Sequence, residues 1–167
     1  MADVAFSPES EEEFQKTIAR YLNKAAATLP VLWIAQRQFG WLSPEVLELV
    51  SQKLDLPYAR VLGVASFYTM FKLKPTGKYH VQICRNLSCA MFGAERATER
   101  ICKKLGIKPG ETTSDKLFTV EQVECLAACG MAPAVQVNEE YYGMMKGEKL
   151  DQLVEVLAEK EKMGGAR

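Results

Sequence analysis

Two close pairs of cysteines constrain this chain more than any other feature of its sequence. Cys84 and Cys89 form a C-x4-C pair, and Cys125 and Cys129 form a C-x3-C pair after a stretch whose pattern predicts a helix and a strand. Each pair can bind one metal atom from a single loop, so a fold that brings the two loops together creates a four-thiolate site. This layout is typical of an iron–sulfur cluster, in which each iron takes two thiolates.

Other uses of the cysteines fit the spacing less well. A zinc ion is the nearest alternative, although zinc ribbons usually have a C-x2-C knuckle in at least one arm, which neither pair has. The C-x-x-C of a thioredoxin-type dithiol is absent. Structural disulfides need an oxidising compartment, whereas the acidic N-terminus does not resemble a signal peptide and the five cysteines indicate a reducing cytosol. We therefore interpret the four paired cysteines as metal ligands.

The composition is that of an ordinary folded protein. The chain has 167 residues, of which 48% are hydrophobic, enough for one domain or two small ones. Lysine plus arginine and aspartate plus glutamate each number 21, which gives no general attraction to nucleic acid or anionic lipid. The most apolar run, residues 25–35, is too short to span a bilayer. We expect no direct membrane span and no nucleic-acid binding, with any membrane attachment through partners.

Helix start and stop signals dominate residues 1 to about 74. A serine followed by proline, which favours an N-cap and the first helical position, occurs at Ser7 and again at Ser43. Apolar residues then recur at helical spacing, and Gly40 marks the end of one such segment. These patterns predict a small bundle of three or four short helices, with the others beginning near Thr28 and Pro57.

Large side chains crowd the end of this bundle, at Phe67, Tyr68, Met70 and Phe71. We interpret them mainly as packing residues at a domain boundary, with any exposed share marking a partner surface. A turn at residues 75–77 separates the two halves of the chain. The predicted organisation is a helical domain over residues 1–76, a second domain over residues 77–160 and a flexible tail over residues 161–167.

After Gly77 the pattern changes to alternating strands and helices. Residues 79–83 predict a strand leading into Cys84, and residues 117–124 predict another leading into Cys125. The remaining predicted elements are a helix over Cys89–Leu105 capped by Ser88, strands at residues 132–137 and 141–143, and a last helix from about Lys149. This order predicts a two-layer α+β sandwich with each cysteine pair after the end of a strand.

Four other residues with side chains that could take part in cluster chemistry need an interpretation. Cys102 lies within a predicted helix, far from either pair, where a lone cysteine is usually a small buried hydrophobe. His80 is the only histidine, and a Rieske-type cluster needs two, so we predict a structural or solvent-facing role. Arg85 and Glu124, each next to a ligand, are expected to act on a cluster's potential in opposite directions.

Several motifs together resemble a known family. Residues 124–133, Glu-Cys-Leu-Ala-Ala-Cys-Gly-Met-Ala-Pro, followed by Asn138 and Tyr141-Tyr142, are similar to the thioredoxin-like [2Fe–2S] subunit (the E-type subunit) of NADH:quinone oxidoreductase, respiratory complex I. The segments Gly-Trp-Leu-Ser-Pro at 40–44 and Gly-Val-Ala-Ser-Phe-Tyr-Thr-Met-Phe at 63–71 extend the resemblance over nearly the whole chain. One departure is Ala127, where relatives commonly have glycine.

The resemblance implies a helical domain followed by a thioredoxin-like [2Fe–2S] ferredoxin domain, with one cluster on Cys84, Cys89, Cys125 and Cys129. It also implies a larger flavoprotein partner that binds FMN and NADH and exchanges electrons with the cluster. The chain has no G-x-G-x-x-G, P-loop or nucleophile elbow. We therefore expect a non-catalytic redox subunit without NADH activity of its own, attached through partners to the cytoplasmic face of the inner membrane.

Two alternatives stay open at the level of sequence. The same kind of subunit occurs in soluble NAD-dependent hydrogenases and formate dehydrogenases, so the resemblance does not fix the host complex. A different class of function is an interaction module in which a zinc ion, held by the same four cysteines, stabilises the fold without any redox role.

Overall fold

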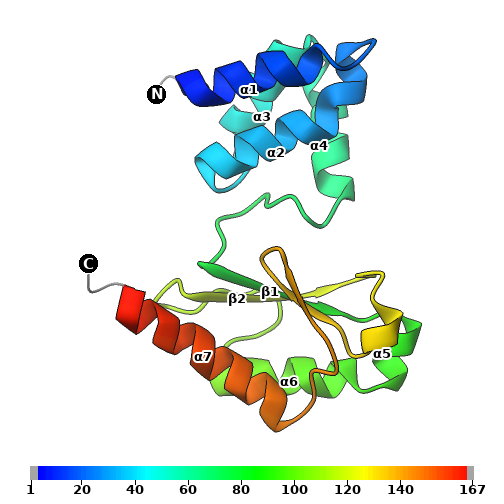
Figure 1. The fold of residues 1–167 in the computed structure, drawn as a ribbon, viewed down its shortest axis with the longest axis vertical. Coiled ribbons are helices and arrows are strands. Elements are labelled where there is room, and N and C mark those ends of the chain that lie inside the picture. The colour runs from blue at the N-terminus through cyan, green and yellow to red at the C-terminus, as the bar shows by residue number, and fades with distance from the viewer. Residues whose placement is uncertain (1–3, 165–167) are drawn as a thin grey trace. The chain divides into compact units, whose positions relative to one another are not determined.

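The computed structural model describes residues 4–164, and the chain divides into two compact units, one ending at Pro75 and the other beginning at Thr76 (Figure 1). The first unit is helical and the second combines helices with a sheet, which confirms the predicted α+β class. Within residues 4–164, no helix is both long and apolar enough to cross a membrane.

From residue 4 onward the first unit has four α-helices, and their starts follow the predicted signals. The helices are α1 (Pro8–Ile18), α2 (Thr28–Phe39), α3 (Pro44–Leu54) and α4 (Tyr58–Phe67), with a short 3-10 turn (Lys24–Ala27) that the sequence pattern did not predict. The Oγ atoms of Ser7 and Ser43 accept hydrogen bonds from the backbone N–H groups of Ser10 and Val46. Each cap satisfies an N–H group that would otherwise lack a helical partner.

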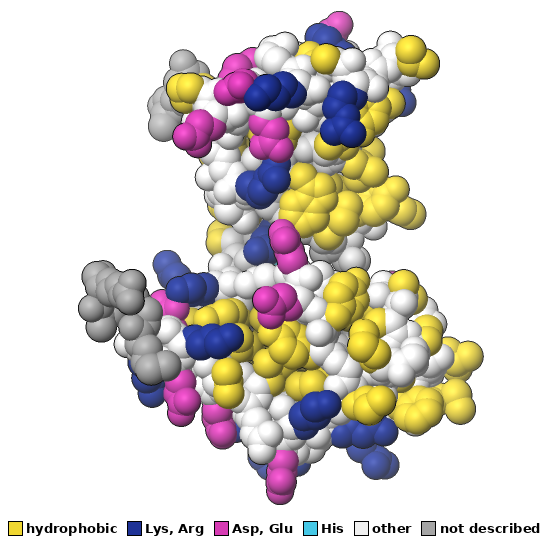
Figure 2. Space-filling model, in the orientation of Figure 1, with side chains coloured by type: hydrophobic (Ala, Val, Ile, Leu, Met, Phe, Trp, Pro, Cys, Tyr) yellow, Lys and Arg dark blue, Asp and Glu magenta, His cyan; other side chains and the backbone are white. Residues whose placement is uncertain are grey.

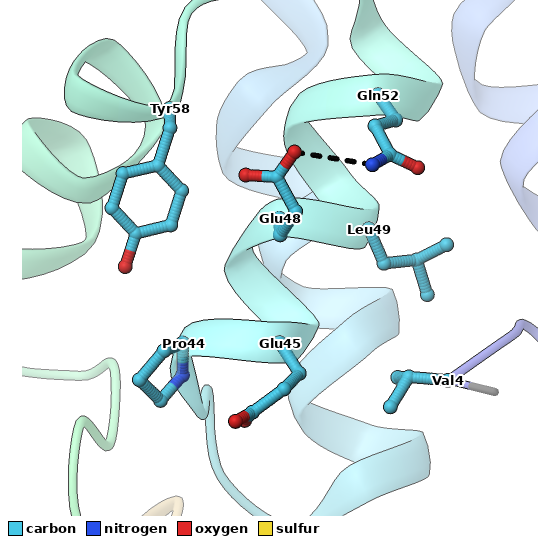
Figure 3. Close-up of a pocket in the computed structure, with 7 residues that line it drawn as sticks. All are labelled: Val4, Pro44, Glu45, Glu48, Leu49, Gln52 and Tyr58. Carbon is cyan, nitrogen blue, oxygen red and sulfur yellow. Dashed lines mark hydrogen bonds between the residues drawn. The ribbon is translucent and has the colours of Figure 1, made fainter. Parts of the chain in front are cut away.

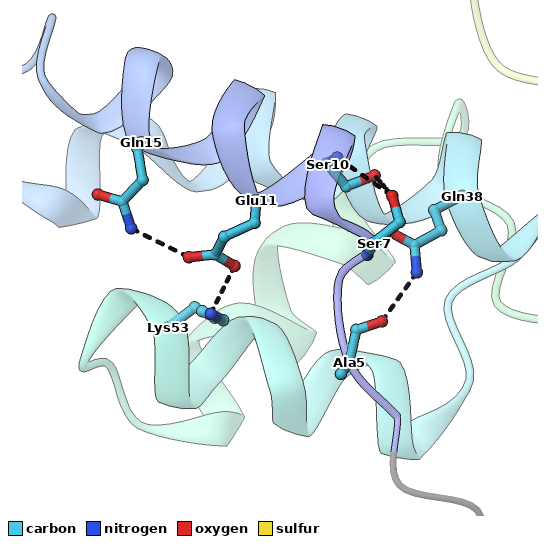
Figure 4. A network of polar contacts seen from close by, with 7 residues as sticks. All are labelled: Ala5, Ser7, Ser10, Glu11, Gln15, Gln38 and Lys53. Atoms are coloured by element: carbon cyan, nitrogen blue, oxygen red, sulfur yellow. Dashed lines mark hydrogen bonds and ion pairs between the residues drawn. The ribbon is translucent and has the colours of Figure 1, made fainter.

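Polar contacts fix α1 against its neighbouring helices (Figure 4). The backbone N–H of Ser7 donates to Gln38 Oε1 at 3.0 Å, and Gln38 Nε2 donates to the carbonyl of Ala5 at 2.8 Å. Lys53 Nζ on α3 lies 2.6 Å from Glu11 Oε2 on α1, and this hydrogen bond lowers the pKa of Glu11. The residues that precede α1 are thus bonded to α2, and α1 itself is bonded to α3.

The apolar cluster at the end of α4 has a buried part and an exposed part. Phe71 is buried, and its ring centroid lies 5.7 Å from that of Trp33 in the core of the first unit. Phe67 and Tyr68 are 77% and 39% exposed, and their rings meet edge to face. Phe71 is therefore a packing residue of the first unit's own core, whereas Phe67 and Tyr68 have the exposure expected of a contact surface.

The second unit is a four-stranded sheet with strand order β2-β1-β3-β4. Its strands are β1 (Tyr79–Cys84), β2 (Phe118–Val123), β3 (Val135–Val137) and β4 (Glu140–Tyr142). β1 and β2 are parallel, whereas β3 is antiparallel to both β1 and β4. Helices α6 (Ala94–Leu105) and α7 (Glu148–Gly164) cover one face of this sheet (Figure 1). Between sheet and helices lies a core that includes Val81, Ile83, Ala97, Ile101, Val120, Val135, Leu150 and Val154.

The single helix predicted over Cys89–Leu105, with Ser88 as its cap, is wrong. The structure has a five-residue helix, α5 (Leu87–Met91), followed by a turn and then α6. Asn86 is the cap, since its Oδ1 accepts from the backbone N–H of Leu87 at 2.8 Å. Gly93 has a φ of +93°, which a right-handed helix cannot contain, so the helix ends before it.

Helix α7 continues to Gly164, so residues 161–164 of the predicted flexible tail belong to this helix. Glu and Lys are good helix formers, and the Glu161 carboxylate pairs with the Lys78 ammonium at the start of the sheet. Residues 165–167 of the predicted tail lie outside the described residues.

Candidate metal centre

Cys84 is the last residue of β1, a strand in the middle of the sheet. Its backbone N–H donates to the carbonyl of Ala134 at 3.2 Å, and its Sγ lies 3.7 Å from the carbonyl oxygen of Glu124. The strand is paired on both sides, and the Cys84 side chain is buried in the core of the second unit. The first predicted ligand is therefore held by the sheet itself.

Cys89 lies in α5 and is buried beside two of the other predicted ligands. Burial raises the pKa of the Cys89 thiol, a hydrogen bond from the backbone of Ala134 opposes this, and the neighbouring Cys84 and Cys129 raise it further. Without a metal this thiol therefore stays protonated at neutral pH. Since only the thiolate is a metal ligand, binding of a metal would release its proton.

The second pair occupies the loop that follows β2. Cys125 is exposed, and its Sγ accepts a hydrogen bond from the backbone N–H of Ala127 at 3.3 Å. Cys129 is also exposed and begins a 3-10 turn (Cys129–Met131). Ala127 has a φ of +53°, in the left-handed region that favours glycine. The loop turns tightly between its two cysteines, with an N–H group directed at one sulfur.

Parallel pairing brings the two loops to the same end of the sheet. Cys84 lies opposite Val123 in the register of β1 and β2, so the loops that follow the two strands begin side by side. Cys89 interacts with both Cys84 and Cys129, whereas the contact found for Cys125 is with its own loop. All five cysteines are free thiols.

The donor set fits a two-iron cluster. A [2Fe–2S] cluster takes two thiolates at each of two irons, which matches two cysteine pairs on adjacent loops. The predicted ligands Cys84, Cys89, Cys125 and Cys129 are the residues that would hold it.

Cys102 and His80 have the structural roles predicted for them. Cys102 is buried in the core beneath the sheet, and burial raises the pKa of its thiol. His80 is buried on β1, where Nε2 lies 2.8 Å from Glu121 Oε2 and the backbone N–H donates to Asn138 Oδ1 at 3.0 Å. Its role is structural, and the solvent-facing alternative is wrong.

Exposed apolar side chains surround the cysteine loops, a feature that the sequence analysis did not identify. Figure 2 shows hydrophobic side chains gathered around α5. We call this group the apolar rim, and its exposed members are Leu87, Met91, Phe92, Met131 and Met144. The residue types alone gave no signal, because leucine, methionine and phenylalanine are also common in buried cores.

Among the described residues, a hollow in the first unit is not lined by the cysteines of the proposed metal centre. It measures about 490 Å³, lies in the first unit along α3, and is lined in part by Glu45, Glu48 and Tyr58 (Figure 3). Glu48 accepts a hydrogen bond from Gln52 one turn later, so its carboxylate already has a partner within the helix. None of the described residues that line this hollow is a cysteine.

The sheet, its helices and the two cysteine loops define a thioredoxin-like iron–sulfur electron carrier. The chain belongs to the thioredoxin-like [2Fe–2S] ferredoxin family, whose profile matches residues 14–158. A [2Fe–2S] cluster is the cofactor of this family, which confirms the predicted cofactor.

Curated relatives extend this assignment. The chain is 46% identical over 133 residues to the E-type subunit of NADH-quinone oxidoreductase from Rickettsia prowazekii, covering 79% of this chain and 75% of the relative. It is 43% identical over 144 residues to the E-type subunit numbered 2 of Rhizobium meliloti, covering 86% of each. Identity to NADH-quinone oxidoreductase subunit 2 of Thermus thermophilus is 41%, over 83% of this chain and 78% of that one. The resemblance to the E-type subunit is thereby confirmed.

A solved structure shares the fold. A chain of an NAD+-reducing [NiFe]-hydrogenase in the air-oxidised state matches with a TM-score of 0.66 at 22% identity, over 81% of this chain. The match spans only 24% of the hydrogenase chain. At this identity the likeness concerns the fold alone.

Proposed function

We propose that this chain is the electron-transfer subunit of an NADH-quinone oxidoreductase, with its [2Fe–2S] cluster held by Cys84, Cys89, Cys125 and Cys129. The convergence of the two cysteine loops at one end of the sheet is the observation that carries this ligand set. The relatives at 41–46% identity support this complex over a soluble hydrogenase or formate dehydrogenase.

The residues of the site divide its environment into two sides. A bound [2Fe–2S] cluster accepts and releases one electron at a time. Cys84 and Cys89 are buried and keep water from one side, whereas Cys125 and Cys129 are exposed and leave the other side open to a redox partner. The N–H groups of Ala127 and Ala134 point at cysteine sulfurs and favour their negative charge.

The partner in this proposal is a larger flavoprotein subunit that binds FMN and NADH. This chain has no nucleotide-binding motif, so NADH oxidation requires that subunit. Association within the complex would also place the chain at the cytoplasmic face of the inner membrane, without a membrane span of its own. The isolated chain should therefore show no NADH oxidation until the flavoprotein is added.

Alanine substitution of each proposed ligand tests the site. We expect the anaerobically purified chain to contain about two irons and two sulfides and to give a spin-half EPR signal after dithionite reduction. Cys84→Ala, Cys89→Ala, Cys125→Ala and Cys129→Ala should each lose most of the iron and visible absorption, because each removes one of four thiolates.

Cys102→Ala is the matched control, since it removes a thiol that lies in the core. Its iron content should equal that of the unaltered chain. One zinc per chain with no sulfide would contradict the proposal and favour the structural zinc module, and full iron content in any ligand variant would remove that residue from the set.

A further inference from the structure

An ion pair joins the two cysteine loops directly beside the proposed ligands. Arg85 follows Cys84 and Glu124 precedes Cys125, and Arg85 Nε donates to Glu124 Oε1 at 3.0 Å. Arg85 Nη2 contacts the same carboxylate oxygen. The guanidinium group is charged under all ordinary conditions, so this contact joins a positive and a negative charge.

The backbone fixes the position of this pair. The N–H of Arg85 donates to the carbonyl of Val123 at 2.9 Å, which extends the pairing of β1 and β2 one residue beyond the strands. Cys84 Sγ also lies 3.7 Å from the carbonyl of Glu124. The two charges are therefore neighbours because of the strand register, and each stands one residue from a different proposed ligand.

We propose that Arg85 and Glu124 are positioning residues that form a charge-neutral clasp across the two ligand loops, so that neither charge alone sets the reduction potential of the cluster. The inference rests on the proposed ligand set. Reduction makes the cluster more negative, so a lone arginine would favour the reduced state and a lone glutamate would oppose it. Held in contact with each other, the two charges largely cancel at the cluster.

The exposure of the pair limits the size of the effect. The two side chains are 56% and 68% exposed, so solvent and salt screen them. We expect removal of one charge to change the reduction equilibrium by about two- to tenfold, which is about 20 to 60 mV at 59 mV per tenfold for one electron. Removal of both charges should leave the equilibrium nearly unchanged.

The test measures the midpoint potential of the full chain with its cluster, by dithionite titration followed by EPR. Arg85→Gln should lower the potential, Glu124→Gln should raise it, and the double variant should return it close to the original value. Higher ionic strength should reduce both single shifts.

Arg100 and Asp151 form a matched control pair between α6 and α7, with Arg100 Nη2 2.5 Å from Asp151 Oδ2. Neither is next to a proposed ligand, so Arg100→Gln and Asp151→Asn should leave the potential unchanged. Single shifts of opposite sign that cancel in the double variant exclude a merely structural role, since loss of a loop contact alone would move the potential the same way in both variants.

Unchanged potentials in both single variants, or shifts in the same direction, would overturn the clasp while leaving the ligand set intact. If Arg85→Gln does not retain iron, Glu124→Gln decides alone, because a higher potential supports the clasp and no change overturns it. Absence of iron and sulfide from the unaltered chain would instead contradict the proposed function, and the clasp with it.

Discussion

Ala127 is the residue of the site whose backbone fits its side chain least well. Its φ of +53° lies in the left-handed region, which costs a residue other than glycine about 1–2 kcal/mol. The Ala127 side chain is exposed, so burial of its methyl group does not offset this strain. The same conformation accompanies the N–H hydrogen bond to Cys125 Sγ, which indicates that the loop is shaped around the sulfur.

Ala127→Gly should therefore stabilise the second unit by up to about 1 kcal/mol, since relief of strain exceeds the entropy that glycine adds to the unfolded chain. Ala127→Val should have the opposite effect, because a β-branched residue at positive φ is strongly disfavoured. The measurement is the urea concentration at which visible cluster absorption is half lost. A lower midpoint for the glycine variant than for the valine variant would contradict this explanation.

At the residue scale, the spacing of the cysteines indicates how they pair but not what surrounds them. Two pairs with short gaps predict a four-thiolate site from chemistry alone, and this ligand set stays a prediction. Cys102 stands apart because it lacks a close partner in sequence. The positive φ of Ala127 could not be predicted, because alanine has no preference for that region. Contact between Arg85 and Glu124 depends on the register of two strands 39 residues apart in sequence, which no local pattern encodes.

At the element scale, the interruption between α5 and α6 positions Cys89. The apolar spacing of Ala90, Ala94 and Ala97 is compatible with one continuous helix, and a single glycine within a helix is tolerated. The sequence pattern therefore could not distinguish a glycine inside a helix from one that ends it. In the structure Gly93 turns the chain, so that α6 packs on the sheet while the separate α5 holds Cys89 beside Cys84.

Gly93→Ala should destabilise the second unit by about 1–2 kcal/mol, because alanine at a φ of +93° is strained even though no atom lies within 4 Å of the added carbon. Gly63→Ala in α4 is the matched control. Its site is equally open but helical, so alanine should stabilise the first unit by about 0.4–1 kcal/mol.

Two optical signals separate these effects. Both tryptophans, Trp33 and Trp41, lie in the first unit, so their fluorescence reports its unfolding, whereas visible cluster absorption reports the second unit. Gly93→Ala should lower the midpoint of the absorption signal and leave that of the fluorescence unchanged. An equal decrease in both midpoints would show that the effect is not confined to the turn between α5 and α6.

At the scale of the whole molecule, the change from helical spacing to alternating strands near Gly77 was enough to predict a helical half followed by an α+β half. The pattern of hydrophobic residues determines which faces are buried, and that information is local. It does not reveal which apolar residues remain exposed once the fold is complete. The apolar rim is such a case, since Met91 and Leu87 lie on a helix too short to show any periodicity.

The apolar rim also bears on the proposed complex. In the proposed complex, electron exchange would bring the flavoprotein close to the exposed cysteines, so its contact surface should include the loops around them. Met91 and Leu87 are 78% and 72% exposed there, and apolar side chains that become buried on association contribute much of an interface's binding energy. Met91→Glu and Leu87→Glu should each weaken binding of the purified flavoprotein subunit by about tenfold or more, measured by calorimetry.

Val156→Glu is the control, because Val156 is an exposed apolar residue on α7 that is not part of the rim. It should bind the flavoprotein as the unaltered chain does. Iron content and the EPR signal should remain unchanged in all three variants, so that a loss of binding reflects the surface and not the cluster. Weaker binding by Val156→Glu than by the two rim variants would place the interface on the helical side of the sheet and separate it from the cysteine loops.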